Sequence, residues 1–114
     1  MEPVTLTETV LGRPLTLRAE PVGEDLLLLV TGGDSPHIGS LTAAAPGIGP
    51  ESFVFPGHRD EAVGELFAAR LAPLFPGRVA VVCGIHYDGI TREGIEAVLS
   101  AGERLALRLL PLLS

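Results

Sequence analysis

A short, uninterrupted apolar run at residues 26–30, Leu-Leu-Leu-Leu-Val, constrains the fold of this chain more than any other segment. Run length alone fits either a buried helix or a buried strand. The Gly32-Gly33 pair that follows and the alternating segments that precede the run favour a strand over residues 25–31, apolar on both faces. Such a strand needs cover on each side, so we expect a helix or a partner subunit on the second face of its sheet.

Two segments before this strand alternate between apolar and polar residues, with the period of half-buried strands. Residues 4–10 and 15–22 flank the turn sequence Gly12-Arg13-Pro14, and together they predict a hairpin. After the diglycine, residues 38–45 predict a further strand. The proline- and glycine-rich stretch that follows, residues 46–57, is expected to be a long loop.

The second half of the chain predicts two helices around one more strand. Residues 60–74 place their apolar side chains on one helical face, and residues 78–84 predict a buried strand. Thr91 is a suitable N-cap for a final helix to about residue 110, with Ile95, Val98 and Leu99 on its buried face. The element order is therefore ββββαβα. We expect a single α+β domain over residues 1–114, with a mostly antiparallel sheet of about five strands and two helices.

The end of the last helix is apolar around most of its circumference. A helix of this kind needs a second apolar surface, and in a chain of 114 residues we expect that surface to be a dimer interface. The prediction is a homodimer through the C-terminal helix, carried by Leu105, Leu107, Leu109, Leu110, Leu112 and Leu113.

The composition limits the classes of molecule that this protein is expected to bind. Hydrophobic residues make up 46% and charged residues 19% of the chain, as in a globular domain, and the formal net charge is -6. The few basic residues are scattered, so neither a nucleic acid nor an anionic membrane surface is an expected partner. The single cysteine, Cys83, lies in an apolar run and predicts a small buried side chain. No stretch fits a membrane span or a signal peptide, which predicts a cytoplasmic protein.

Each of the three histidines lies in a short polar segment rich in glycine, with an acidic residue close by. His37 follows Asp34, His86 precedes Asp88, and His58 precedes two acids. Glycine at such places permits sharp turns and the close approach of a ligand to the backbone. If the fold brings the three segments together, they form one polar pocket of imidazole, carboxylate and amide groups. We expect that pocket to be the functional site.

Two chemistries fit these segments, and the sequence leaves both open. The backbone amides of residues 31–36 can bind a phosphate or a carboxylate, with Arg59 and the imidazoles as further donors, although the same residues also fit an ordinary turn. Alternatively, the imidazoles can form a three-nitrogen metal site that suits zinc, made of His37, His58 and His86. Catalysis has less support, because Ser35 lacks the surroundings of a nucleophile and no carboxylate pair has a recognisable acid–base spacing.

Taken together, the three segments resemble the pattern of a known family. Thr31-Gly-Gly-Asp-Ser-Pro-His-Ile-Gly39, Gly57-His-Arg-Asp60 and Gly84-Ile-His-Tyr-Asp88 are similar to segments of the LpdD-like family, and the similarity spans most of the chain in the same order of elements. These are small bacterial proteins related to a small subunit of hydroxyarylic-acid decarboxylases of the gallate or vanillate type. The resemblance implies a fold similar to a proteasome assembly chaperone, usually dimeric.

The resemblance also implies a function, that of a non-catalytic accessory protein. Such a chaperone binds prenylated flavin mononucleotide (prenylated FMN) and delivers it to a UbiD-type decarboxylase, so the expected role is cofactor handling and not catalysis. A small metal-dependent enzyme and a pure assembly module are the two alternatives. The ligand-binding candidates are Gly32, Gly33, Asp34, Ser35, His37, Gly39, His58, Arg59, His86 and Asp88.

Overall fold

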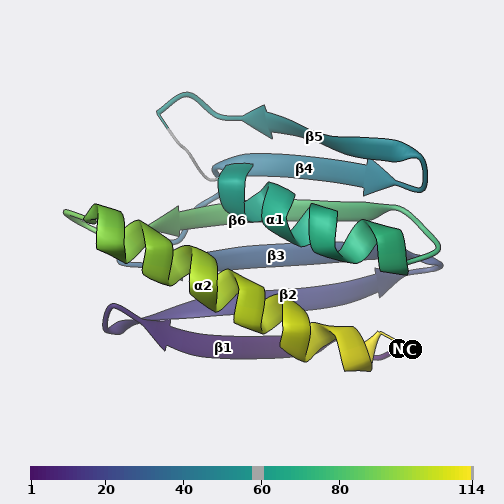
Figure 1. The fold of residues 1–114 in the computed structure, drawn as a ribbon, viewed down its shortest axis with the longest axis horizontal. Helices are drawn as coiled ribbons and strands as arrows, with labels where there is room; N and C mark the ends of the chain where they lie inside the picture. Colours follow the sequence, from purple (N-terminus) through teal and green to yellow (C-terminus); the bar gives the residue numbers. More distant parts are fainter. Residues whose placement is uncertain (58–60, 114) are drawn as a thin grey trace.

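The computed structural model describes residues 1–57 and 61–113, which form one six-stranded sheet with two α-helices on one face (Figure 1). This α+β architecture confirms the predicted fold class. None of the described helices combines the length and apolarity that crossing a membrane requires. The elements in chain order are β1 (Val4–Val10), β2 (Arg13–Val22), β3 (Asp25–Gly33), β4 (Ser40–Ala45), β5 (Ile48–Val54), α1 (Glu61–Leu71), η1 (Ala72–Leu74), β6 (Val79–His86), α2 (Arg92–Leu109) and η2 (Leu110–Leu112).

The strands lie in the order β1-β2-β3-β6-β4-β5. All neighbouring strands are antiparallel except β3 and β6, which run parallel at the centre of the sheet. The mostly antiparallel sheet is therefore as predicted. The parallel pair brings the carboxyl ends of β3 and β6 to the same edge, and these ends carry two of the three histidine segments. Open sheets with parallel strands bind their ligands most often at such an edge.

One prediction about the sheet was wrong. The stretch expected to be a long loop contains β5, which pairs with β4 as the sixth strand. The sequence hides this strand because Ile-Gly-Pro-Glu-Ser-Phe-Val has no clean alternation and contains Pro50. Proline is tolerated here because β5 is an edge strand, where a missing N–H breaks no ladder. Gly47, with a φ of 76°, makes the tight turn that joins β4 to β5.

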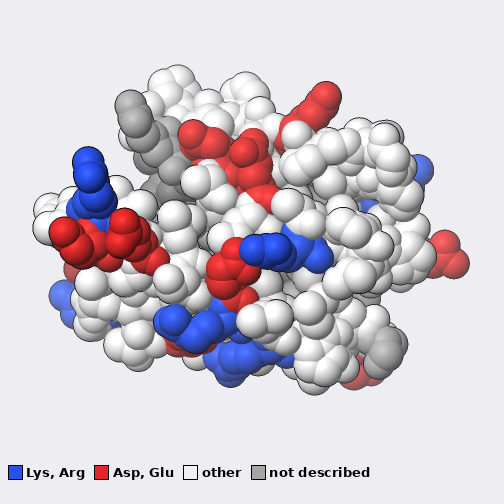
Figure 2. Space-filling model, in the orientation of Figure 1, with Lys and Arg blue, Asp and Glu red and all other residues white. Residues whose placement is uncertain are grey.

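The hydrophobic core lies between the sheet and the helices. Alternate residues of the central strands point to the helix side and are buried, among them Leu28 and Val30 of β3 and Val81 and Cys83 of β6. The burial of Cys83 confirms its predicted role as a small core residue. Phe67 of α1 and Leu105 of α2 fill the space above them. On the outer side of this layer, Figure 2 shows acidic and basic side chains interspersed over the helices.

The C-terminal leucines are divided between the core and the surface. Leu105 and Leu109 are fully buried against the sheet, whereas Leu107 and Leu112 are 65% and 42% exposed. Contacts within the chain therefore explain part of the apolar surface of α2, because this helix packs on β1 and α1. A dimer through this helix stays a prediction.

The burial of Leu71, the last residue of α1, and the exposure of Leu74, the last residue of η1, predict that truncating them lowers the free energy of unfolding by different amounts. Leu71 is fully buried, whereas Leu74, one turn later, is 66% exposed. Leu71→Ala is expected to lower the free energy of unfolding by about 2–5 kcal/mol, because it leaves a cavity in the core. Leu74→Ala is the matched control and is expected to change it by less than about 0.5 kcal/mol. Urea unfolding measures both, and equal losses would contradict this placement of α1.

Candidate functional site

The connection between β3 and β4 has to cross β6, because β6 lies between these two strands in the sheet. It crosses at Gly84, where a Cβ atom would overlap the carbonyl oxygen of His37. The crossing is held by backbone hydrogen bonds: Asp34 N and Ser35 N both donate to His86 O, at 2.6 and 3.4 Å. Gly84 therefore places the segment of His37 directly beside the segment of His86.

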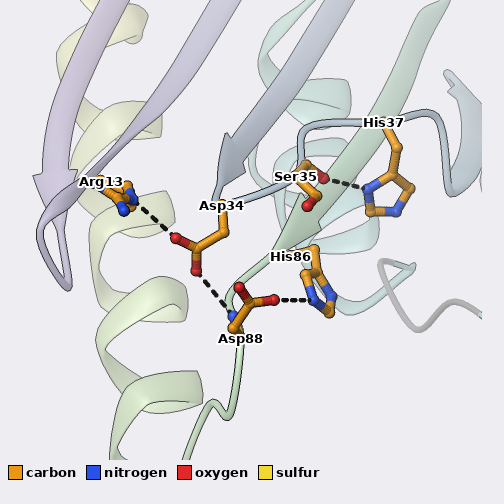
Figure 3. Close-up of polar contacts among 6 residues, drawn as sticks. All are labelled: Arg13, Asp34, Ser35, His37, His86 and Asp88. Atoms are coloured by element: carbon orange, nitrogen blue, oxygen red, sulfur yellow. Dashed lines mark hydrogen bonds and ion pairs between the residues drawn. The ribbon is translucent and has the colours of Figure 1, made fainter.

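An ionic chain ties three separate turns together at this edge (Figure 3). Arg13 Nε, in the β1–β2 hairpin, donates to Asp34 Oδ1 at 2.8 Å. The other oxygen, Asp34 Oδ2, accepts from the backbone N–H of Asp88 at 2.9 Å. His86 Nε2 and Asp88 Oδ1 are 2.9 Å apart. Asp34 thus links the hairpin and the end of β3 to the residues that follow β6.

Asp34 is held in its ionised form by these contacts. The hydrogen bond from Arg13, followed by that from the Asp88 N–H, lowers the pKa of the Asp34 carboxyl below its usual value. Partial burial opposes the shift, while the charges of Arg13 and His86 add to it. Both carboxylate oxygens are already engaged by donors of the chain itself, so Asp34 acts by holding the loops in place.

The hydrogen bonds also fix how the two described imidazoles present their nitrogens. His37 Nδ1 lies 2.9 Å from the Ser35 carbonyl oxygen, which only accepts, so Nδ1 carries a proton. In His86 the Nε2 atom faces the Asp88 carboxylate and donates to it. A carboxylate partner of this kind sets the tautomer and the orientation of a histidine ring. The two rings therefore have defined orientations before any ligand arrives.

A cavity of about 600 Å³ opens beside these two rings. Its size lies in the range of small-molecule sites in proteins, roughly 300–1,000 Å³. The polar part of its lining is His37, His86 and Tyr87, and burial raises the pKa of the Tyr87 phenol, so that it stays neutral. The rest of the lining is apolar or glycine, and consists of Gly57, Ala62, Val63, Ile85, Ile90, Ile95, Val98 and Leu99.

Both helices start at the cavity. Ala62 and Val63 belong to the first turn of α1, and Ile95 and Val98 to the first two turns of α2. Thr91 caps α2 as predicted, since its hydroxyl accepts from Gly94 N at 3.1 Å. Helix N-termini carry a partial positive charge that favours anions. The cavity therefore combines apolar walls with two imidazoles and the positive ends of two helices.

The structure brings together two of the three predicted histidines. His37 and His86 line one cavity, while His58 and Arg59 lie outside the described residues. Gly32 and Gly33 end β3 and pair with Ile85 and His86, and Gly39 N donates to Cys83 O at 2.9 Å. The amides of Asp34 and Ser35 are used by His86 O, so these two are not available to a phosphate.

The sequence did not predict two parts of this site, the Arg13 side chain and the apolar wall of the cavity. Arg13 was assigned only to a turn, and nothing local to it indicates a contact with Asp34, 21 residues away. Ile95 was expected in the buried core, but it is 49% exposed because it lines the open cavity. The repeated isoleucines at the start of α2, beside a histidine segment, were the one available signal for an apolar binding wall.

No cluster of metal-binding side chains in the described part of the chain supports the hypothesis of a metal site. Within residues 1–57 and 61–113 there is no group of three or more histidine, cysteine or acidic side chains placed to hold a metal ion. The third proposed ligand, His58, lies outside these residues. The three-histidine site therefore stays a hypothesis.

The ion pair predicts a measurable titration of Asp34. Its pKa is expected below 3.8, so the stabilisation it gives is present above that pH and is lost as the pH falls through the lowered pKa. Arg13→Gln should raise the pKa toward 3.8. The matched control is Arg18→Gln, because Arg18 is similarly exposed but pairs with Glu20. Carboxyl carbon NMR follows the titration, and an unchanged Asp34 pKa in Arg13→Gln would contradict the assignment.

Comparison with known proteins agrees with the resemblance seen in the sequence. Residues 10–114 match the family model described as Prenylated flavin chaperone LpdD-like domain. The chain is 31% identical over 111 residues to Protein LpdD of Lactiplantibacillus plantarum, covering 93% of this chain and 82% of that protein.

A solved structure, a chaperone complex for yeast 20S proteasome assembly, is similar with a TM-score of 0.62 and covers 99% of this chain and 98% of its own. At 14% identity this likeness shows the fold alone, which is the fold expected from the resemblance. The match over nearly the whole sequence is what assigns the family. The chain belongs to the LpdD-like family of prenylated flavin chaperone domains.

Proposed function

We propose that this protein binds prenylated FMN in the cavity between His37, His86 and the starts of α1 and α2, and delivers it to a UbiD-type decarboxylase. The observation that carries the proposal is the mixed lining of the cavity, which combines two imidazoles and a phenol with a set of aliphatic side chains. Membership in a family described as prenylated flavin chaperones supports this cargo.

The chemistry of the cavity suits both halves of such a ligand. A modified flavin has a broad apolar ring system and, at the other end of the molecule, a phosphate. Ile90, Ile95 and Leu99 offer contacts to the rings. In their protonated form the two imidazoles have a second N–H, at Nε2 of His37 and Nδ1 of His86, which can donate to the phosphate. The helix N-termini add positive potential. His58 and Arg59, which follow Gly57 in the chain, stay in the proposed binding set.

The proposed role is non-catalytic. The hydrogen bonds of Asp34 and Asp88 are used to hold loop positions and ring orientation, which are the requirements of a binding site. The cavity opens to the surface, so a ligand can leave it for a client enzyme without unfolding of the core. A chaperone needs both properties, because it has to protect its cargo and also release it.

Retention of the flavin during gel filtration tests the proposal. Prenylated FMN mixed with the wild-type protein is expected to elute with the protein peak at micromolar concentration. His86→Ala and His37→Ala each remove an imidazole that donates to an anion when both of its nitrogens are protonated, and each is expected to weaken binding roughly tenfold or more. Arg70→Ala is the control, because Arg70 pairs with Glu103 at the far end of α1. Flavin that elutes separately from the wild type would overturn the proposal.

The apolar wall gives a second prediction with a matched control on the same helix. Ile95→Ser is expected to weaken the binding of prenylated FMN about tenfold, because it removes an apolar contact while Ile95 contributes little to the core. Leu107→Ser, at an exposed position outside the cavity, should leave binding unchanged. Fluorescence titration measures both affinities, and equal effects of the two variants would contradict the location of the site.

Delivery requires its own assay. Loaded protein is expected to activate an apo UbiD-type decarboxylase faster than the same concentration of free prenylated FMN. If free cofactor activates the enzyme equally fast, the protein stores the flavin without delivering it.

A further inference from the structure

Arg92 is the first residue of α2, directly after the N-cap Thr91, and its side chain is exposed. A base at this position works against helix stability, because the partial positive charge of a helix N-terminus favours acids. Among the arginines of residues 1–57 and 61–113, Arg92 alone makes no ion pair with a carboxylate, although Glu93 and Glu96 are close to it in the helix. The described structure therefore assigns no partner to this positive charge.

Arg92 lies on the face of α2 that forms the cavity wall. Ile95 and Leu99 follow it at i+3 and i+7, the spacing of residues on one face of a helix, and both line the cavity. Ile90, two residues before Arg92, lines the cavity as well. Lining residues thus flank Arg92 in both directions along the chain, which places its side chain at the rim of the cavity.

The burial of the lining residues shows which end of the cavity is open. Tyr87 and Val98 are each only 5% exposed and form the closed end, which we call the floor. Ile90 and Ile95 are 38% and 49% exposed and belong to the open end, which we call the mouth. Because Arg92 lies between these two isoleucines in the sequence, its charge is at the mouth and not at the floor.

We propose that Arg92 binds the phosphate of the flavin at the mouth, with the ring system toward the floor. This inference rests on the proposed function, because it names the residue that recognises the anionic end of the same cargo. A guanidinium can form two parallel hydrogen bonds with a phosphate and stays charged at any physiological pH. The imidazole of His86, by contrast, gains its second N–H only on protonation. The positive end of α2 adds to the attraction.

The chemistry of the floor supports this direction of binding. Val98 is apolar, and the phenol of Tyr87 stays neutral because burial raises its pKa. A phosphate at the floor would lose its hydration without gaining an opposite charge, which is costly. At the mouth the phosphate keeps part of its hydration and is the first group of the cargo that a client enzyme can contact. Release can then begin at Arg92 while the rings are still covered.

Two ligands that differ only in the phosphate test this role of Arg92. The wild type is expected to bind prenylated FMN at least about tenfold more tightly than its dephosphorylated form, prenylated riboflavin. Arg92→Gln should raise the Kd of prenylated FMN about tenfold and change that of prenylated riboflavin by less than about twofold. Fluorescence titration measures all four values.

Arg78→Gln is the matched control. Arg78 is an exposed arginine that directly precedes β6, whereas the cavity lies at the other end of this strand, beyond His86. The control is expected to keep the affinities of the wild type for both flavins. A tenfold loss in Arg78→Gln as well would show a general effect of net charge and would overturn the assignment to Arg92.

Unfolding in urea distinguishes a binding role from a structural one. Arg92→Glu puts an acid at the start of α2, where the helix dipole favours it, so the urea midpoint is expected to stay the same or to rise. Binding of prenylated FMN should nevertheless fall further than in Arg92→Gln, because the new carboxylate repels the phosphate. A lower midpoint together with equal losses for both flavins would show that Arg92 supports the fold, and would overturn the inference.

The same titrations separate the failure of this inference from the failure of the proposed function. A wild type that binds neither flavin contradicts both. A wild type that binds the two flavins equally, or an Arg92→Gln variant that keeps the preference for the phosphate, overturns only the role of Arg92. Loss of that preference in Arg59→Gln instead would assign the phosphate to Arg59.

Discussion

The crossing of the β3–β4 connection over β6 is the constraint on which the site depends. The parallel pairing of β3 with β6 obliges the chain to cross β6 on its way to β4, and it crosses where Gly84 has no side chain. Any side chain at that position would push the carbonyl of His37 away from the sheet. One missing Cβ atom therefore places His37 next to His86, and the ionic chain from Arg13 through Asp34 keeps the loops there.

The topology also explains why both polar and apolar side chains line the cavity. The carboxyl ends of β3 and β6 and the N-termini of α1 and α2 meet at one end of the molecule (Figure 1). The end of β6 and the β3–β4 connection supply the histidines, and the helix starts supply aliphatic side chains together with positive potential. A ligand with an apolar ring system and an anionic group matches both sides at once. The same residues lie apart in the sequence, so only the fold makes them a site.

Much of the fold was predictable because it depends on local patterns. Alternation gave the hairpin, the apolar run gave β3, and Thr91 marked the start of α2, since each signal lies within the element itself. β5 was missed because an edge strand with Pro50 lacks that pattern. The site was harder to predict, because Arg13 and Asp34 meet only through the pairing of β2 with β3. The apolar run predicted a helix or a partner subunit on the second face of the sheet, but the two described helices both lie on one face.

The central claim is that the cavity between His37 and His86 is where the flavin binds. Nitrogen NMR of uniformly labelled protein, recorded at imidazole and backbone nitrogens while prenylated FMN is added, tests it most directly. The account predicts that the ring signals of His37 and His86 shift in parallel and saturate at one flavin per chain, while the backbone amide of Gly47 at the far end of the sheet does not move. Saturable binding that shifts Gly47 and leaves both imidazoles unchanged would contradict it.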